Sequence, residues 1–148
     1  GIKWCELRES IVQRLRTALP DLLDTAITWR LDKSERSVRF VGLGDHLSFS
    51  RHIGPHKGLS RHRDSMQHVQ CNGRPCPDGC LLKLAINLSS TPIGTAFYAD
   101  GAPDSPPLVQ SSGARGSAIL FDMRMWHSGT AVRTGECKKM LGIRLFFE

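Results

Sequence analysis

The sequence contains few aromatic residues: six Phe, three Trp and one Tyr make up 7% of its 148 residues. Proteins that bind single-stranded nucleic acid stack the bases on such rings, so this composition argues against a base-stacking platform. The sequence also lacks the run of about 20 apolar residues that a membrane-spanning helix needs, because its longest apolar run, near 81–88, contains Lys83. No signal-peptide pattern follows Gly1. These absences predict an intracellular protein, cytoplasmic or nuclear, with no membrane partner.

Cysteine is present in an odd number, five, and three of the five lie between positions 71 and 80. An odd number of cysteines crowded into one loop is not typical of a disulfide framework. Two interpretations stay open: free thiols in a loop that contacts substrate, or a structural zinc ion, since thiolates and imidazole together suit zinc. The zinc ligands would be His68, Cys71, Cys76 and Cys80.

The remaining composition is that of an ordinary globular domain, with 40% hydrophobic and 23% charged residues. A chain of 148 residues is expected to form one domain, over positions 1–148, with a core large enough to fold without disulfides. The net charge of +6 favours acidic partners. One group of basic residues has two interpretations: a rim that attracts an acidic peptide or a phosphate backbone, and a charged face that is simply solvated. The group consists of Arg51, Lys57, Arg61 and Arg63.

The spacing of apolar residues predicts one N-terminal helix followed mostly by strands. Apolar residues recur every three or four positions from Leu7 to Ala18, and Pro20 ends the pattern, which indicates a helix over about 6–19. Beyond it the apolar period is two, which is typical of strands. We therefore predict a mainly β fold with an N-terminal helix (α+β), in which about 26–148 form a double-stranded β-helix, or jelly roll. The expected strands cover 26–31, 37–43, 47–53, 81–88, 94–99, 108–111, 117–121 and 138–147, with a loop over 68–79.

Two histidines and one aspartate form the candidate metal site. His62 and Asp64 are two positions apart, and residues two apart in a strand project to the same side, so both could reach one ion. His127 lies 63 residues beyond Asp64, after the expected strand 117–121. Two imidazoles and one carboxylate that leave coordination positions open are the ligands of a non-haem Fe(II) oxygenase. A surface pair is the other interpretation of a His-x-Asp sequence by itself.

The last expected strand, 138–147, carries basic residues on one face. Lys138 and Arg144 share that face, while the opposite face is apolar. If the apolar face packs outside the barrel, the two basic side chains point inward, where a cation is costly unless it is paired. An acidic co-substrate would supply the partner; in the alternative arrangement both side chains face solvent.

These residues resemble the motifs of the Fe(II)/2-oxoglutarate-dependent dioxygenases, in particular the prolyl-hydroxylase-like and phytanoyl-hydroxylase-like branches. The run from His52 to Asp64, His-Ile-Gly-Pro-His-Lys-Gly-Leu-Ser-Arg-His-Arg-Asp, is similar to the segment that leads into the iron ligands of prolyl hydroxylases. Gly-Ser-Ala-Ile-Leu-Phe-Asp at 116–122 and Trp-His-Ser-Gly-Thr at 126–130 resemble the strand and distal histidine of the superfamily. Lys138 follows that histidine by eleven positions, where the family carries the basic residue that binds the distal carboxylate of 2-oxoglutarate. The resemblance covers about 38–148.

The resemblance implies an enzyme, an oxygenase in which His62, Asp64 and His127 bind Fe(II) and carry the catalysis. It implies O2 and 2-oxoglutarate as co-substrates, ascorbate as a supporting reductant, and the release of succinate and CO2. Lys138 is expected to bind 2-oxoglutarate, and Lys139 would replace it if the strand slipped by one position. Other residues expected to bind the co-substrate are His52, which stands at the family's tyrosine position, Asn87, within Ala-Ile-Asn-Leu, and Arg144.

Three functions stay open. The resemblance to prolyl hydroxylases favours hydroxylation of a protein or amino-acid side chain. The basic charge, and Arg144 six positions after Lys138 as in AlkB-type demethylases, fit an oxygenase of modified bases in nucleic acid, although the few aromatic residues count against it. A catalytically silent jelly-roll binding module that kept the pocket is the third. We expect a protein or peptide substrate in preference to nucleic acid.

Overall fold

The computed structural model describes residues 3–31, 34–75 and 80–148. It consists mainly of antiparallel strands and has a helix near its N-terminus, as the apolar spacing predicts. None of the described helices is long and apolar enough to cross a membrane. In chain order the elements are α1 (Trp4–Ala18), α2 (Pro20–Leu23), β1 (Ile27–Leu31), β2 (Ser34–Val38), β3 (Phe40–Leu43), β4 (Ser48–Ile53), β5 (Gln70–Cys71), β6 (Arg74–Pro75), β7 (Leu81–Asn87), β8 (Thr95–Tyr98), β9 (Val109–Gln110), β10 (Ala118–Asp122), β11 (Trp126–Gly129) and β12 (Cys137–Phe147).

Helix α1 has nearly the bounds predicted for it. Its expected apolar stripe meets the core only in part: Ile11 and Leu15 pack against buried residues, whereas Leu7 stays 39% exposed. Pro20 begins the short helix α2 instead of only ending α1, because the fixed φ of proline suits the first turn of a helix.

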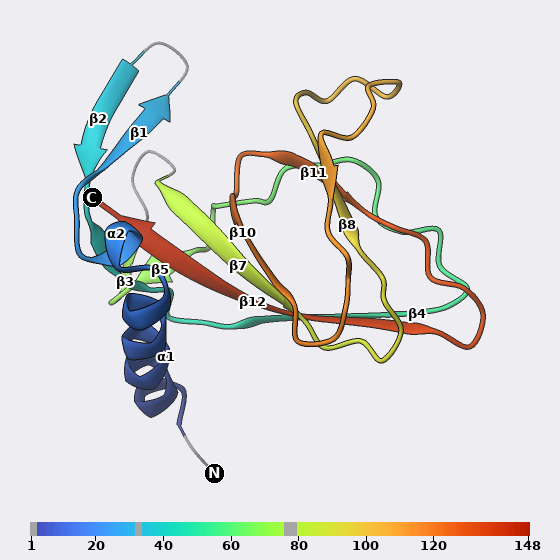
Figure 1. The fold of residues 1–148 in the computed structure, drawn as a ribbon, viewed down its shortest axis with the longest axis horizontal. Helices are drawn as coiled ribbons and strands as arrows, with labels where there is room; N and C mark the ends of the chain where they lie inside the picture. The colour runs from blue at the N-terminus through green and yellow to red at the C-terminus, as the bar shows by residue number, and fades with distance from the viewer. Residues whose placement is uncertain (1–2, 32–33, 76–79) are drawn as a thin grey trace.

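A five-stranded antiparallel sheet forms one layer. Its order is β10-β7-β12-β3, and β4 also pairs with β12. Strand β12, with 11 residues, pairs with β7 along one side and with β4 and then β3 along the other. Figure 1 shows β12 running diagonally through the fold. Residues several positions apart on this strand therefore reach different parts of the layer.

A three-stranded antiparallel sheet, β11-β8-β9, forms a second layer. The buried side chains of Ala85 on β7, Phe97 on β8 and Phe121 on β10 form one apolar cluster. Because these residues belong to both sheets, the two layers face each other across this cluster. In Figure 1, β8 and β11 lie on the right, away from the helices.

The larger apolar core lies at the end where the helices and the β1–β2 hairpin pack. Trp29 and Val38 of the hairpin are buried there against Ile143, Leu145 and Phe147 of β12. The rings of Trp29 and Phe147 have centroids 5.8 Å apart. The C-terminal part of β12 therefore anchors the core, while its opposite face is free to line a pocket.

Three local predictions differ from the structure. The expected strand 37–43 is interrupted at Arg39, whose backbone exchanges two hydrogen bonds with Glu148, so β2 and β3 join different sheets. The expected loop 68–79 contains the β5–β6 hairpin, which turns at Asn72 and Gly73, a pair that favours tight hairpin turns. Strand β11 is not among the expected strands, because its four residues show no apolar alternation; its pairing with β8 makes it a strand.

Candidate metal centre

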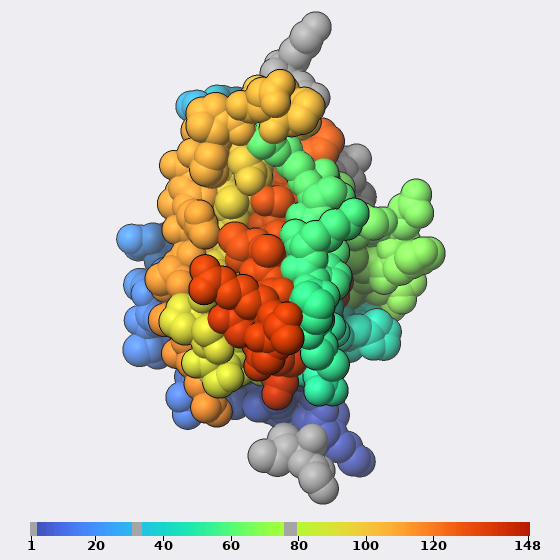
Figure 2. Space-filling view, turned by 90° about the vertical axis from the view of Figure 1, so that its right-hand side faces the viewer, coloured from blue at the N-terminus to red at the C-terminus, as the bar shows by residue number. Residues whose placement is uncertain are grey.

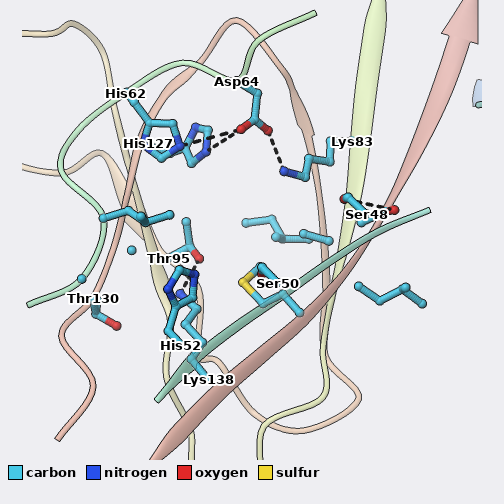
Figure 3. Close-up of a pocket in the computed structure, with 18 of the residues that line it drawn as sticks. Ser48, Ser50, His52, His62, Asp64, Lys83, Thr95, His127, Thr130 and Lys138 are labelled. Atoms are coloured by element: carbon cyan, nitrogen blue, oxygen red, sulfur yellow. Dashed lines mark hydrogen bonds and ion pairs between the residues drawn. The ribbon is translucent and has the colours of Figure 1, made fainter. Parts of the chain in front are cut away.

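A pocket of about 240 Å³ lies between the two sheets. Seen end-on in Figure 2, the segments around 45–60, 90–115 and 125–140 meet on the face that looks toward the viewer. The apolar lining includes Leu59, Phe97, Ile119, Phe121 and Met140. The polar lining, much of it drawn in Figure 3, includes Ser48, Ser50, His52, His62, Asp64, Lys83, Thr95, His127, Thr130, Lys138 and Arg144.

The three residues predicted to bind iron converge in this pocket. The Nε2 atoms of His62 and His127 each lie 3.7 Å from Oδ1 of Asp64, and the two imidazole centroids are 4.3 Å apart. The three ligand atoms lie within 4.8 Å of one another, and Figure 3 shows both rings directed toward the carboxylate. Among residues 3–31, 34–75 and 80–148, no other group of three or more His, Cys, Asp or Glu side chains is arranged in this way.

Hydrogen bonds to the backbone fix which nitrogen of each imidazole is free. Nδ1 of His62 lies 2.8 Å from the carbonyl oxygen of Ser60, and Nδ1 of His127 lies 3.0 Å from that of Met125. A carbonyl oxygen only accepts, so each Nδ1 carries the proton and donates it. Burial also lowers the pKa of His127, which favours the neutral ring. Two Nε2 lone pairs then face a carboxylate, and such an arrangement is favourable when a cation lies between them.

A two-way backbone bridge holds the two histidines together. The amide of each donates to the carbonyl oxygen of the other, both at 2.9 Å. His127 belongs to β11, lies opposite Phe97 of β8 and is 6% exposed. We expected His62 and Asp64 on one strand, and this is wrong: the segment forms only the single bridge at His62. The bridge to His127, not strand alternation, brings these side chains to one point.

Lys83 is a member of the site that the sequence did not assign. Its Nζ donates to Oδ2 of Asp64 at 2.6 Å. The two carboxylate oxygens therefore have different partners, since Oδ1 faces the imidazoles. A signal for this residue existed, because a lysine inside an apolar strand needs an anion. Sequence spacing could not identify Asp64 as that anion, since the contact depends on how the loop before β7 folds back.

Lys138 lies in the part of the pocket away from the three candidate ligands (Figure 3), and it is 3% exposed. Its Nζ donates to the carbonyl oxygen of Gly94 at 2.7 Å and to the hydroxyl oxygen of Thr95 at 3.2 Å. Burial lowers the pKa of Lys138 from 10.5 to about 8. Both oxygen partners are uncharged, so the buried ammonium has no anionic partner among the described residues. Lys139, the alternative anchor, is exposed.

The other residues predicted to bind the co-substrate divide into two groups. His52 and Arg144 line the pocket, so the solvent-facing alternative for the basic face of β12 is wrong. The His52 ring lies 4.9 Å from that of His56, and burial lowers the pKa of His52. Asn87 does not line this pocket. It borders a neighbouring cavity of about 200 Å³, and its Oδ1 accepts a hydrogen bond from the amide of Ser89 at 3.0 Å.

The predicted zinc ligands do not form a metal-binding group in the part of the chain that the structure describes, and Cys76 lies outside the described residues. Cys71 packs in an apolar cluster with Phe146. Cys80 is buried in the main core and accepts a hydrogen bond from Arg36 at 2.6 Å. His68 is exposed. The burial of Cys71 and Cys80 is therefore explained by their apolar packing.

No protein-family model matches the chain, and no curated protein matches it. Among solved structures, the chain is similar to EvdMO1, with 14% identity and a TM-score of 0.47 over 93% of this chain and 42% of that one. It is also similar to AviO1 from Streptomyces viridochromogenes Tue57, with 13% identity and a TM-score of 0.48 over 93% of this chain and 80% of that one. The chain thus spans less than half the length of EvdMO1. Likenesses at this level assign neither fold nor function.

Proposed function

We propose that the chain is an Fe(II)- and 2-oxoglutarate-dependent oxygenase that hydroxylates a C–H bond of a protein or amino-acid side chain. One observation carries the proposal: three electron-pair donors converge in a pocket that also holds a buried ammonium, and no described residue supplies an anion to that ammonium. Such a pocket suits a metal ion together with an acidic co-substrate.

The donor set fits Fe(II). His62 and His127 offer Nε2 atoms that their Nδ1 hydrogen bonds leave free, and Asp64 offers one oxygen, because the other oxygen is held by Lys83. Imidazoles with one carboxylate are ligands that suit this ion and leave positions open for other molecules. Backbone acceptors of both Nδ1–H groups hold the rings in orientation, as is usual around metal ligands.

Lys138 fits the far carboxylate of 2-oxoglutarate. Among the described residues, its ammonium has hydrogen bonds only to the carbonyl oxygen of Gly94 and the hydroxyl of Thr95, and the residue is 3% exposed. A carboxylate from the co-substrate would supply the missing charge, and the Thr95 hydroxyl could donate a second hydrogen bond to it. His52 lines the same part of the pocket.

The order of the strands supports a double-stranded β-helix. From β7 onward, successive strands pass from the larger sheet to the smaller one and back: β7 is in the first, β8 and β9 in the second, β10 in the first, β11 in the second and β12 in the first. The site lies between the two layers, as in barrels that enclose a ligand.

Iron, 2-oxoglutarate and O2 together supply an oxidant that converts C–H to C–OH, with release of succinate and CO2. The chain's own residues position and shield this chemistry. Phe97 and Phe121 pack against the His127 ring, with centroids 5.9 and 5.2 Å away. The same rings, with Ile119 and Met140, line the pocket with apolar atoms, which reduces the contact of the reacting centre with water.

Succinate formation tests the proposal. The protein is supplied with Fe(II), ascorbate and labelled 2-oxoglutarate, and then with a proline-containing peptide library, free amino acids or an oligonucleotide with methylated bases. We expect peptide or amino acid to stimulate succinate release, and His62→Ala to abolish it. Stimulation by the oligonucleotide alone would favour the nucleic-acid alternative. Folded protein that forms no succinate in any mixture would favour a silent binding module.

A further inference from the structure

Lys83 and Arg144 form a second basic part of the pocket, apart from Lys138. Binding of Fe(II) and 2-oxoglutarate gives these two residues no role. Lys83 on β7 and Arg144 on β12 are directly opposite each other in the strand register, and both line the pocket. Side chains at such positions are neighbours, and like charges placed there destabilise a sheet. The charge of Lys83 is compensated by its ion pair with Asp64. Arg144 forms no ion pair with a described residue, and its buried Nε makes no hydrogen bond to one.

Gly142 leaves space for the side chains of Lys83 and Ser48. It lies on the same face of β12 as Arg144, between Met140 and Arg144. A Cβ at Gly142 would lie 3.0 Å from Cε of Lys83 and would overlap Oγ of Ser48. The lysine stem and the serine hydroxyl therefore meet over a position that has no side chain. The Ser48 hydroxyl donates a long hydrogen bond, 3.4 Å, to the carbonyl oxygen of Gly142 on the strand that carries Arg144, and Ser48, Lys83 and Arg144 all line the pocket.

The side chains of Arg144 and Lys138 lie in different parts of the pocket. Six residues of strand separate their Cα atoms by about 20 Å. The Lys138 ammonium is fixed on Gly94 and Thr95 of the smaller sheet's side, whereas Arg144 lies opposite Lys83. A single small dicarboxylate bound at Lys138 is therefore poorly placed to neutralise Arg144 as well.

The charges of the loaded pocket do not balance. Asp64 is the one carboxylate among the residues that line the pocket in the described part of the chain, against the cations Lys83, Lys138 and Arg144. A divalent iron ion adds two positive charges and 2-oxoglutarate brings two negative ones. The filled site would then hold two positive charges in excess, which is costly in a partly buried site.

We propose that Ser48, Lys83 and Arg144 bind an anionic oxygen group, a carboxylate or a phosphate, on the molecule that is oxidised. This inference rests on the proposed function, which it deepens by assigning an acidic primary substrate. Arg144 supplies a planar pair of donors for such a group. The anionic group would then hold the substrate beside Asp64 and the metal.

The test uses whole protein loaded anaerobically with Fe(II) and 2-oxoglutarate, so that Lys138 is already engaged. Formation of the visible band of the Fe(II)–2-oxoglutarate chelate comes first. Butyrate, butyl phosphate and the neutral butyramide are then titrated, and binding is read from paramagnetic broadening of their proton NMR lines. We expect one of the acids to bind at least about tenfold more tightly than butyramide, and the preference between the acids identifies carboxylate or phosphate.

Arg144→Gln is expected to weaken binding of the acid about tenfold or more, and Arg144→Lys to restore part of it. Lys139→Gln, an exposed lysine on the same strand, is the matched control and should behave as wild type. A chelate band with no preference for either acid would overturn this inference and leave the oxygenase intact. Loss of the band itself in Arg144→Gln would assign Arg144 to the co-substrate and also overturn it. No band in wild type would overturn both proposals.

Discussion

Replacing Lys138 with Met is expected to raise the Kd for 2-oxoglutarate by about 10²–10³-fold. The ammonium is buried, and its two hydrogen-bond partners among the described residues are uncharged oxygens. Removing one member of a buried charge pair costs about 3–5 kcal/mol, and each 1.4 kcal/mol is a factor of ten in affinity. Methionine keeps the length and apolar stem of the side chain, so packing should change little. Anaerobic titration with 2-oxoglutarate at saturating Fe(II) measures the effect.

Lys139→Met is the matched control, because Lys139 adjoins Lys138 on β12 and is exposed. It should bind 2-oxoglutarate as wild type does. Lys138→Met should also retain its metal, since Lys138 contacts none of the three candidate ligands. Equal losses in the two variants would contradict the assignment of Lys138 as the anchor.

The same residue should make co-substrate binding depend on pH. Burial lowers the pKa of Lys138 to about 8, and only the protonated ammonium attracts a carboxylate. The Kd should therefore be nearly constant below about pH 7 and rise about tenfold per pH unit well above pH 8. Burial lowers the pKa of His52 from its ordinary value, so titration of this ring does not contribute to the rise above pH 7. Lys138→Met should lose the dependence.

Replacing Asp64 with Ala is expected to lower metal affinity by at least about 100-fold. The variant removes one of three ligands and leaves the Lys83 ammonium facing two imidazoles without its carboxylate. Mutation of residues that merely orient ligands already costs about 10–100-fold, so loss of a ligand should cost more. Anaerobic equilibrium dialysis with Fe(II), or with Co(II) as a stable substitute, measures this affinity.

Asp104→Ala removes an exposed carboxylate and serves as the control. It should bind metal as wild type does. Circular dichroism would show that both variants are folded. Metal binding by Asp64→Ala within about twofold of wild type would show that the three residues do not act as one site.

Much of the fold could be predicted from local pattern. Helix α1, β7 and β12 lie nearly where the apolar spacing put them, because each carries a clear period of its own. Strand β11 could not be found in this way, since Trp-His-Ser-Gly has no alternation and becomes a strand through its partner β8. Burial of Lys138 could be predicted because the apolar face of β12 packs on the core. The other face, which carries Lys138, is then directed toward the pocket.

The candidate site also contains residues that the sequence could identify and residues that it could not. His62, Asp64 and His127 could be chosen by residue type and spacing, but their approach depends on a bridge between residues 65 positions apart. Lys83 and its pairing with Asp64 were missed, because the register of β7 against β12 and the path of the 62–64 segment are tertiary facts. Asn87 was expected near the co-substrate, but its side chain binds the amide of Ser89 beside a neighbouring cavity.

The measurement that tests the central claim most directly is an anaerobic titration of wild type and His62→Ala with Fe(II) and 2-oxoglutarate. The readout is the visible absorption band of the metal chelate, with folding checked by circular dichroism. We predict that the band forms in wild type and is absent in folded His62→Ala. Absence of the band in folded wild type, or an equal band in both proteins, would contradict a metal and co-substrate site at these residues.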